Sequence, residues 1–368
     1  MVCEKHWSLQ SFFFPSHFFL SQKIRPWTCE PLPKRPSHTI VLTVCLLWFC
    51  STGRRPQQPM SDLGISSPST NSKAKDTSSL HTLFVWDFDW TVINANSDEY
   101  IPAFFLGKEA TEEGLREAWK STNGDWHACV EILVNRVLSQ TDTTNDDILE
   151  AARQMPYLEQ VKETFATIQA KTEQQSESGA TVGQMILSDG NTLFIEAFCK
   201  YSLQNIDFTH GIVSNRGRFL TTDDDASKAP LEVVHYSEGN PHDCPSCPAN
   251  LCKTRALQDQ LLLSYRDDEI RNFRIVYVGD GANDACPALR YLQEQDTLLA
   301  RRGKRDDEAH ERRGPQNAHI PSGGSFGIEK ALVKDPTLSP QCNVHYWTTG
   351  DELKDLVGDL LSEISCRR

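Results

Sequence analysis

Several apolar segments of this chain each end in acidic or hydroxyl residues, and this pattern restricts both the fold and the chemistry of the protein. The run Leu83–Trp86 is followed at once by Asp87 and Asp89, two carboxylates only one residue apart. Two later apolar runs end in the same way, in "SDG" at residues 188–190 and in "GDGAND" at residues 279–284. Because crowded like charges repel, such strand ends indicate a bound cation or a chemical task.

Strand-like and helix-like segments alternate along most of the chain. Short apolar runs at residues 81–87, 181–191, 208–215 and 273–279 have the length and composition of buried strands. Segments with apolar residues at three- and four-residue spacing lie between them. This alternation predicts the α/β class, with a Rossmann-like open parallel sheet that carries helices on both faces.

A long helix-rich segment interrupts the predicted sheet after its first strand. Residues 96–180 repeat the apolar spacing of helices, and Asn145 and Asp146 are the candidate N-cap of one of them. We therefore expect an inserted helical cap domain at residues 96–180. The core would be formed by residues 81–95 and 181–368.

The polar strand ends should converge, because the carboxyl ends of parallel strands meet at the edge of a sheet where ligands usually bind. Four carboxylates form the oxygen donor set that Mg²⁺ prefers: Asp87, Asp89, Asp280 and Asp284. The hydroxyl of Ser188 and the amides of its turn offer an anion site, and Lys253 supplies a fixed cation. Such a site can hold a phosphate while one aspartate attacks phosphorus and another handles protons.

The same residues carry a family resemblance. In order and spacing, "DFDWT", "ILSDGN", Lys253 and "GDGAND" resemble the four motifs of the haloacid dehalogenase superfamily of phosphatases. The segments "NSD", "SDGNTLFIEAF", "CPSCPANLCK" and "YVGDGANDACPAL" are similar to its phosphoethanolamine/phosphocholine and pyridoxal-phosphate phosphatase branch. The resemblance extends over about residues 83–360, is weak in the helical insert and is absent from the first eighty residues.

The resemblance implies a role for each matching position. Asp87 would be the nucleophile that forms an aspartyl-phosphate, and Asp89 the acid and base. The phosphate-binding residues would be Thr91, Ser188, Asp189, Gly190 and Lys253. The Mg²⁺ ligands would be Asp87, Asp89 through its backbone carbonyl, Asp280 and Asp284.

The implied substrate is a small phosphorylated metabolite such as phosphoethanolamine, phosphocholine or pyridoxal phosphate, with pyrophosphate and thiamine monophosphate as further candidates. Two alternatives stay open: a phosphotransferase or mutase of the same fold, and a catalytically silent phosphometabolite-binding protein. Asn94 and Ala95 replace acidic residues of the branch, and Trp90 is bulky for its motif; these departures bear on the substrate. Ser214 is a rival for Ser188, although we expect it to line the next strand end together with Asn215.

A cysteine-rich stretch precedes Lys253. His242, Cys244, Cys247 and Cys252 have zinc-like spacing but lack a second strong pair. We favour reduced, partly buried thiols here, with structural zinc and a disulfide as alternatives.

Composition and charge restrict the partners and the location of the protein. The net charge of −13 argues against a general nucleic-acid binder. The 12 cysteines form no dense disulfide framework, which favours a reducing, cytoplasmic location. Oligomeric state cannot be assigned from these features.

Residues 1–80 differ from the rest and are interpreted as an extension and linker that is disordered or serves in targeting. The apolar run at residues 39–50 is short for a membrane span, which needs about 20 residues. Three interpretations compete: a signal anchor or uncleaved targeting segment, a processed targeting peptide, and an upstream extension with translation starting at Met60. The first would bring the protein to a membrane.

Overall fold

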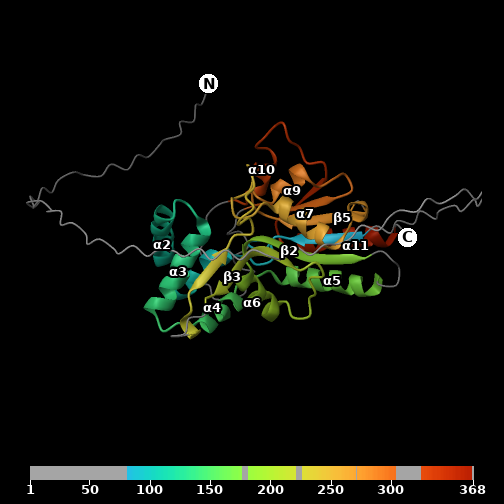
Figure 1. The fold of residues 1–368 in the computed structure, drawn as a ribbon. Helices are drawn as coiled ribbons and strands as arrows, with labels where there is room; N and C mark the ends of the chain where they lie inside the picture. Colours follow the sequence, from blue (N-terminus) through green and yellow to red (C-terminus); the bar gives the residue numbers. More distant parts are fainter. Residues whose placement is uncertain (1–80, 176–180, 221–225, 271, 304–324, 367–368) are drawn as a thin grey trace, which may run out of the picture. The chain divides into compact units, whose positions relative to one another are not determined.

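The computed structural model describes residues 81–175, 181–220, 226–270, 272–303 and 325–366 (Figure 1). The expectations for residues 1–80 lie outside these ranges. Among the described helices, none combines the length and the apolar character that a membrane crossing requires.

The described residues form a seven-stranded sheet with the order β4-β3-β2-β1-β5-β6-β7. Its strands are β1 His81–Trp86, β2 Val182–Asn191, β3 Ile212–Phe219, β4 Leu231–Val234, β5 Phe273–Gly279, β6 Thr297–Arg301 and β7 Asn343–Trp347. All neighbouring strands run parallel except β3 and β4, which are antiparallel. The prediction of an open, mainly parallel α/β sheet is therefore confirmed.

In the described part of the chain, five helices lie between β1 and β2: α1 Ser97–Leu106, α2 Lys108–Ser121, α3 Trp126–Gln140, α4 Asn145–Arg153 and α5 Glu159–Gln175. The later helices are α6 Thr192–Ser202, α7 Lys253–Ser264, α8 Asp267–Ile270, α9 Ala285–Arg290, α10 Ile328–Leu332 and α11 Gly350–Cys366, with a short 3₁₀ turn η1 at Ala226–Lys228.

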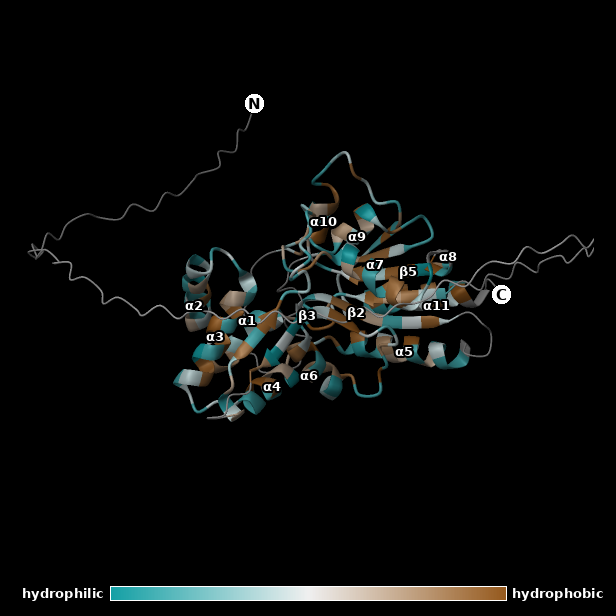
Figure 2. Cartoon of the chain, viewed as in Figure 1, coloured by the Kyte–Doolittle hydropathy of each residue, from teal (hydrophilic) through white to brown (hydrophobic). Residues whose placement is uncertain are grey.

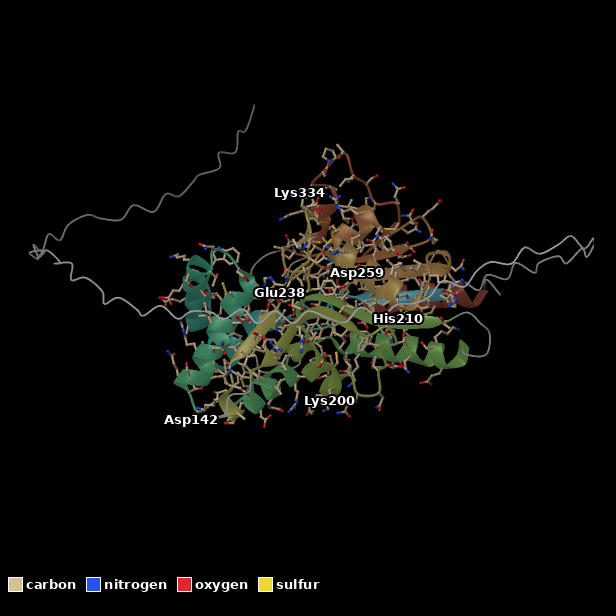
Figure 3. The ribbon with its side chains drawn as sticks, in the orientation of Figure 1. Asp142, Lys200, His210, Glu238, Asp259 and Lys334 are labelled. Atoms are coloured by element: carbon tan, nitrogen blue, oxygen red, sulfur yellow. The ribbon has the colours of Figure 1, made fainter. Side chains whose placement is uncertain are left out.

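Helices cover both faces of the sheet because side chains alternate along each strand. In β1, Phe84 and Trp86 belong to one apolar core, in which the rings of Trp86 and Phe165 of α5 lie 4.6 Å apart. Leu83 and Val85 belong to a second core, formed largely with α7 and α9. Apolar residues accordingly concentrate on the strands and on the helix faces that meet them (Figure 2). Exposed charged side chains such as Lys200 and Lys334 lie at the periphery (Figure 3).

The central position of β1 brings distant segments to one edge. Trp86, its last residue, is paired with Ile186 of β2 on one side and with Val278 of β5 on the other. Because the three strands are parallel and in step, the residues that follow each pairing emerge together. The segments that begin at Asp87, Ser188 and Gly279 therefore share the carboxyl edge of the sheet.

Two helices of the insert pack against different parts of the sheet. α5 packs on the sheet: Thr172 donates a hydrogen bond to the carbonyl of Val182 in β2 (2.8 Å), and Lys354 of α11 pairs with Glu163 (2.6 Å). The division at residue 180 stays a proposal, and these contacts favour a cap that ends before α5. Helix α3 of the insert instead meets the edge strand β4, where the Asn135 side chain hydrogen-bonds both backbone groups of Leu231.

One local prediction is wrong. Neither Asn145 nor Asp146 caps α4. The N-cap is Thr144, whose side chain accepts from the backbone of Asp147 while the Asp147 carboxylate accepts from the backbone N–H of Thr144. This reciprocal capping box satisfies two backbone donors at once and so prevails over a cap one residue later.

Candidate active site

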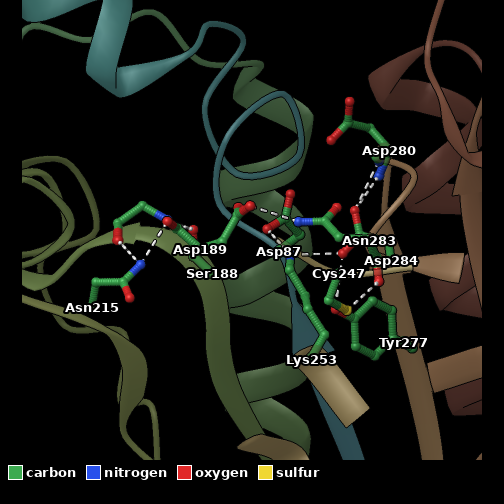
Figure 4. Close-up of polar contacts among 12 residues, drawn as sticks. Asp87, Ser188, Asp189, Asn215, Cys247, Lys253, Tyr277, Asp280, Asn283 and Asp284 are labelled. Atoms are coloured by element: carbon green, nitrogen blue, oxygen red, sulfur yellow. Dashed lines mark hydrogen bonds and ion pairs between the residues drawn. The ribbon is translucent and has the colours of Figure 1, made fainter. Parts of the chain in front are cut away.

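Three carboxylates meet at the carboxyl edge of the sheet (Figure 4). Asp87, Asp280 and Asp284 are buried, and each offers an oxygen that lies within 4.8 Å of the other two. Lys253, the first residue of α7, is fully buried beside them. Its ammonium group donates to Asp87 Oδ1 and to Asp284 Oδ1, the latter at 2.7 Å.

The charges of this cluster are not balanced by the side chains that form it. Burial, and then repulsion from Asp284, raise the pKa of Asp87 well above its usual value, and the attraction of Lys253 offsets this only in part. Burial alone would lower the pKa of Lys253, but Asp284 and Asp87 outweigh it and raise that pKa. One persistent cation thus faces three carboxylates, an oxygen-rich and acidic site of the kind that suits a hard divalent ion.

Asp284 is held in place by the turn that follows β5. Its Oδ2 accepts from the backbone N–H groups of Asp280 (3.1 Å) and Gly281 (2.8 Å), and its Oδ1 accepts from the hydroxyl of Tyr277 (2.9 Å). The turn passes so close to this carboxylate that a Cβ on Gly279 would lie 2.4 Å from Asp284 Cγ. A glycine is therefore required at the end of β5.

The Asp89 side chain contacts the start of α1. Its Oδ1 accepts from the backbone N–H of Ser97 at the start of α1 (2.9 Å), and its side chain is not part of the three-carboxylate cluster. Burial and then the charge of Asp98 raise the pKa of Asp89 well above its usual value. Asp98 itself accepts from Trp126 of α3 (2.9 Å) and Asn191 of β2 (3.4 Å). Asp89 therefore lies beside the start of the helical insert, in surroundings that favour a protonated carboxyl group.

The turn after β2 is fixed from several directions. Ser188 Oγ accepts from the backbone N–H of Gly190 (3.1 Å). Asn215 at the end of β3 donates to the carbonyls of Asp189 (2.7 Å) and Gly190 (2.8 Å). The Asp189 side chain accepts from Asn283 of the "GDGAND" turn (2.8 Å). Asn215, rather than Ser214, thus shapes this turn.

Residues of α3 and of the loop before α7 also reach this turn. The carbonyl of Asp189 lies 3.0 Å from Nε2 of the buried His127 in α3, and it accepts from Asn250 (3.2 Å). The tips of β2 and β5, helix α3 and the loop before α7 therefore meet at one place.

Trp90, which is bulky for its motif, and Thr91, a predicted phosphate-binding residue, directly follow Asp89 in the first motif. Thr91 is buried, and its backbone N–H donates to Phe88 (3.3 Å). Trp90 adopts a positive φ of 59°, its ring packs against Phe326, and its carbonyl accepts from Arg301. The bulky ring is thus buried against Phe326.

The structure adds residues that our sequence reasoning did not assign to the site: Tyr277, Asn283, Asp98 and His127. Asn283 and Asp98 lie inside quoted motifs, so their positions carried a signal. In the sequence, Tyr277 resembles any other strand residue and His127 any other helix residue. Only the three-dimensional structure places these two side chains at the site.

Comparison with known proteins identifies the family. Residues 82–361 match a family model described as "Putative Phosphatase". A probable phosphatase from Xenopus tropicalis is 26% identical over 74% of this chain and 96% of its own length. A thiamine phosphate phosphatase-like protein from Arabidopsis thaliana is 29% identical over 77% of this chain and 96% of its own.

A pyridoxal phosphate phosphatase from Mus musculus is 27% identical over 61% of this chain and 83% of its own length. The family match covers most of the chain, and it includes every strand except the first residue of β1. The protein therefore belongs to this family of phosphatases.

Proposed function

We propose that this phosphatase is a Mg²⁺-dependent phosphomonoester hydrolase that works through an aspartyl-phosphate on Asp87. The observation that carries the proposal is the convergence of three buried carboxylates with a buried lysine at the carboxyl edge of the sheet. A small phosphorylated metabolite is the proposed substrate class.

The donor set fits Mg²⁺. Asp87, Asp280 and Asp284 offer only oxygen atoms, which are the ligands that hard divalent cations prefer. Together with the backbone carbonyl of Asp89 they would hold the ion. When bound, Mg²⁺ would offset the repulsion among the carboxylates and the charge of an incoming phosphate.

In the first chemical step, a carboxylate oxygen of Asp87 attacks phosphorus, and the bond between phosphorus and the ester oxygen breaks. Asp89 gives its proton to the departing oxygen, so the alcohol leaves neutral. The raised pKa of Asp89 supports this role, because a general acid must hold its proton until it is needed. Lys253, Ser188 and the amides of the 188–190 turn would stabilise the phosphoryl oxygens.

In the second step, the ionised Asp89 takes a proton from water, and the water oxygen attacks the phosphorus of the aspartyl-phosphate. The bond between phosphorus and Asp87 breaks, phosphate is released, and both aspartates return to their starting states. The cap contacts through Asp98 and His127 support the exclusion of bulk water during these steps.

The leaving group is proposed from relatives and from the resemblance stated above. One relative is named for pyridoxal phosphate and another for thiamine phosphate. Phosphoethanolamine and phosphocholine complete the panel, with pyrophosphate as a further member. In this chain the leaving group would meet the cap near Asp98 and Trp126.

The test combines this panel with two variants. Phosphate release should require Mg²⁺ and should fall at least about 10³-fold in Asp87→Asn and about 10²- to 10⁴-fold in Asp89→Asn. Mass spectrometry of the wild-type protein quenched during turnover should find one added phosphoryl group on Asp87. Turnover of Asp87→Asn at the wild-type rate would refute the nucleophile.

Product analysis separates the alternatives. Free phosphate as the product supports hydrolysis, whereas a phosphorylated acceptor would identify a phosphotransferase or mutase. Binding of panel members without turnover at any pH would identify a silent binding protein. The intact Asp89, which a binding protein does not need, favours the hydrolase.

A further inference from the structure

A second cluster of potential metal ligands lies beside the acidic one. The Sγ atoms of Cys244, Cys247, Cys252 and Cys286 all lie within 4.8 Å of one another. The first three come from the loop before α7, and Cys286 comes from the first turn of α9. The loop contributes three cysteines, and Cys286 contributes the fourth sulfur from a segment that is distant in the sequence.

The sulfur separations fit one tetrahedral ion. Zn–S bonds are about 2.3 Å, so the sulfurs of a tetrahedral tetrathiolate site lie about 3.8 Å apart. Cys244 Sγ is 3.5 Å and Cys252 Sγ is 4.0 Å from Cys286 Sγ. A disulfide needs a sulfur separation of about 2.05 Å, and all four thiols are free.

Hydrogen-bond donors and a helix N-terminus surround the sulfurs. Backbone N–H groups donate to two of the sulfurs, that of Lys253 to Cys247 and that of Arg255 to Cys252. Cys252 also occupies the N-cap of α7, where the helix dipole favours negative charge. The hydroxyl of Thr254 lies 3.0 Å from Cys286 Sγ. These donors match the outer hydrogen bonds that hold metal-bound ligands in place.

His242 is not a candidate ligand in this arrangement. Its Nε2 lies 3.0 Å from the carbonyl of Pro248, and its Nδ1 accepts from the backbone N–H of Cys244 (3.3 Å). Both ring nitrogens are therefore engaged by the loop itself. The histidine instead helps to shape the turn that presents Cys244 and Cys247.

We propose that Cys244, Cys247, Cys252 and Cys286 bind one structural zinc ion. The ion would tie the loop before α7 to the start of α9. Cys252 immediately precedes Lys253, and Cys286 lies two residues after Asp284, so the same ion would fix the relative positions of two residues of the acidic site. Its role is that of a structural support, separate from the proposed Mg²⁺ site.

The test measures zinc directly in the full-length protein, prepared under reducing conditions and reconstituted with zinc alone. Elemental analysis should find one tightly held zinc per chain, which survives an excess of Mg²⁺. X-ray absorption at the zinc edge should show four sulfur neighbours at about 2.3 Å. A shell dominated by oxygen or nitrogen, or no retained zinc, would overturn the proposal.

Matched variants assign the ligands. Cys286→Ser and Cys244→Ser should weaken zinc binding at least tenfold, whereas His242→Gln and the buried, distant Cys199→Ser should retain it. Asp87→Asn should also retain zinc, which separates this proposal from the proposed hydrolase activity. Full retention in both Cys286→Ser and Cys244→Ser would contradict the assignment, and the absorption spectrum of the wild-type protein decides the matter if either variant fails to fold.

Discussion

Lys253 is the residue on which the charge balance of the acidic site depends. It is buried and pairs with Asp87 and Asp284, both of which are also buried. Removing one partner of a buried ion pair leaves uncompensated charge in a region that water does not reach. The cost of losing Lys253 should therefore far exceed that of losing a lysine in a surface pair.

Lys253→Met should lower the free energy of unfolding by about 3–5 kcal/mol and abolish turnover. Lys354→Met is the matched control, because Lys354 pairs with Glu163 in a half-exposed site where such pairs contribute about 0–1 kcal/mol. Urea denaturation followed by circular dichroism measures both. Equal losses in the two variants would show that burial of the Lys253 pair carries no special weight.

Asp98 should control the pH at which Asp89 works. As a general acid Asp89 must be protonated, so kcat should decline as pH rises through its pKa. Burial and then the charge of Asp98 raise that pKa, so Asp98→Asn should shift the decline to lower pH. Measuring kcat against pH, with the exposed Asp142→Asn as control, checks this; a shift toward higher pH would contradict it.

At the level of elements, the end of β5 depends on the glycine that precedes the acidic turn. In Gly279→Ala the new Cβ would collide with Asp284, which must move, so Mg²⁺ should bind about tenfold more weakly. Stability should fall by about 1–3 kcal/mol through overpacking. Mg²⁺ titration of activity and urea denaturation measure the two effects.

Gly358→Ala supplies the matched control for that change. Gly358 lies within α11, and a Cβ there would meet nothing within 4 Å. Because alanine favours a helix over glycine, this variant should gain about 0.5–1 kcal/mol and leave Mg²⁺ dependence unchanged. A comparable loss of Mg²⁺ affinity in both variants would argue against a steric effect at Asp284.

Some of these strands and helices could be predicted from the sequence, and others could not. β1, β2 and β5 were predictable because each is a long apolar run that ends in a polar motif. β4 and β6 have no counterpart among the predicted strands: β4 is short and held by Asn135 of α3, and β6 is defined by its pairing with β5 and β7. α5 reads as part of the insert, and its packing against the sheet follows only from tertiary contacts.

At the site, the motif residues were predictable because each motif is a short contiguous stretch of the sequence. The contact between Cys286 and the loop cysteines was not, because it joins segments that approach each other only in the folded chain. Asp98 is an intermediate case: it lies within a quoted motif, yet its effect on Asp89 depends on the geometry at the start of α1.

For the whole molecule, Mg²⁺ binding should be linked to folding. A ligand that binds only the native state stabilises it by about 2.7 kcal/mol at 100 times its dissociation constant. Melting should therefore shift upward with added Mg²⁺ in buffer freed of metals beforehand, without a soluble chelator that would also remove zinc. Asp280→Asn should lose most of this shift, while an undiminished shift would place the ion elsewhere.

The central place of β1 has a consequence for biosynthesis. The ribosome makes this strand early, yet its partners Val182 and Val278 belong to segments that emerge much later. At about 5–20 residues per second, the apolar stretch around Phe84 waits on the order of ten seconds or more before its second neighbour exists. Nascent chains should therefore engage holding chaperones until β5 has left the exit tunnel, and truncation before that strand should yield aggregates instead of a smaller native domain.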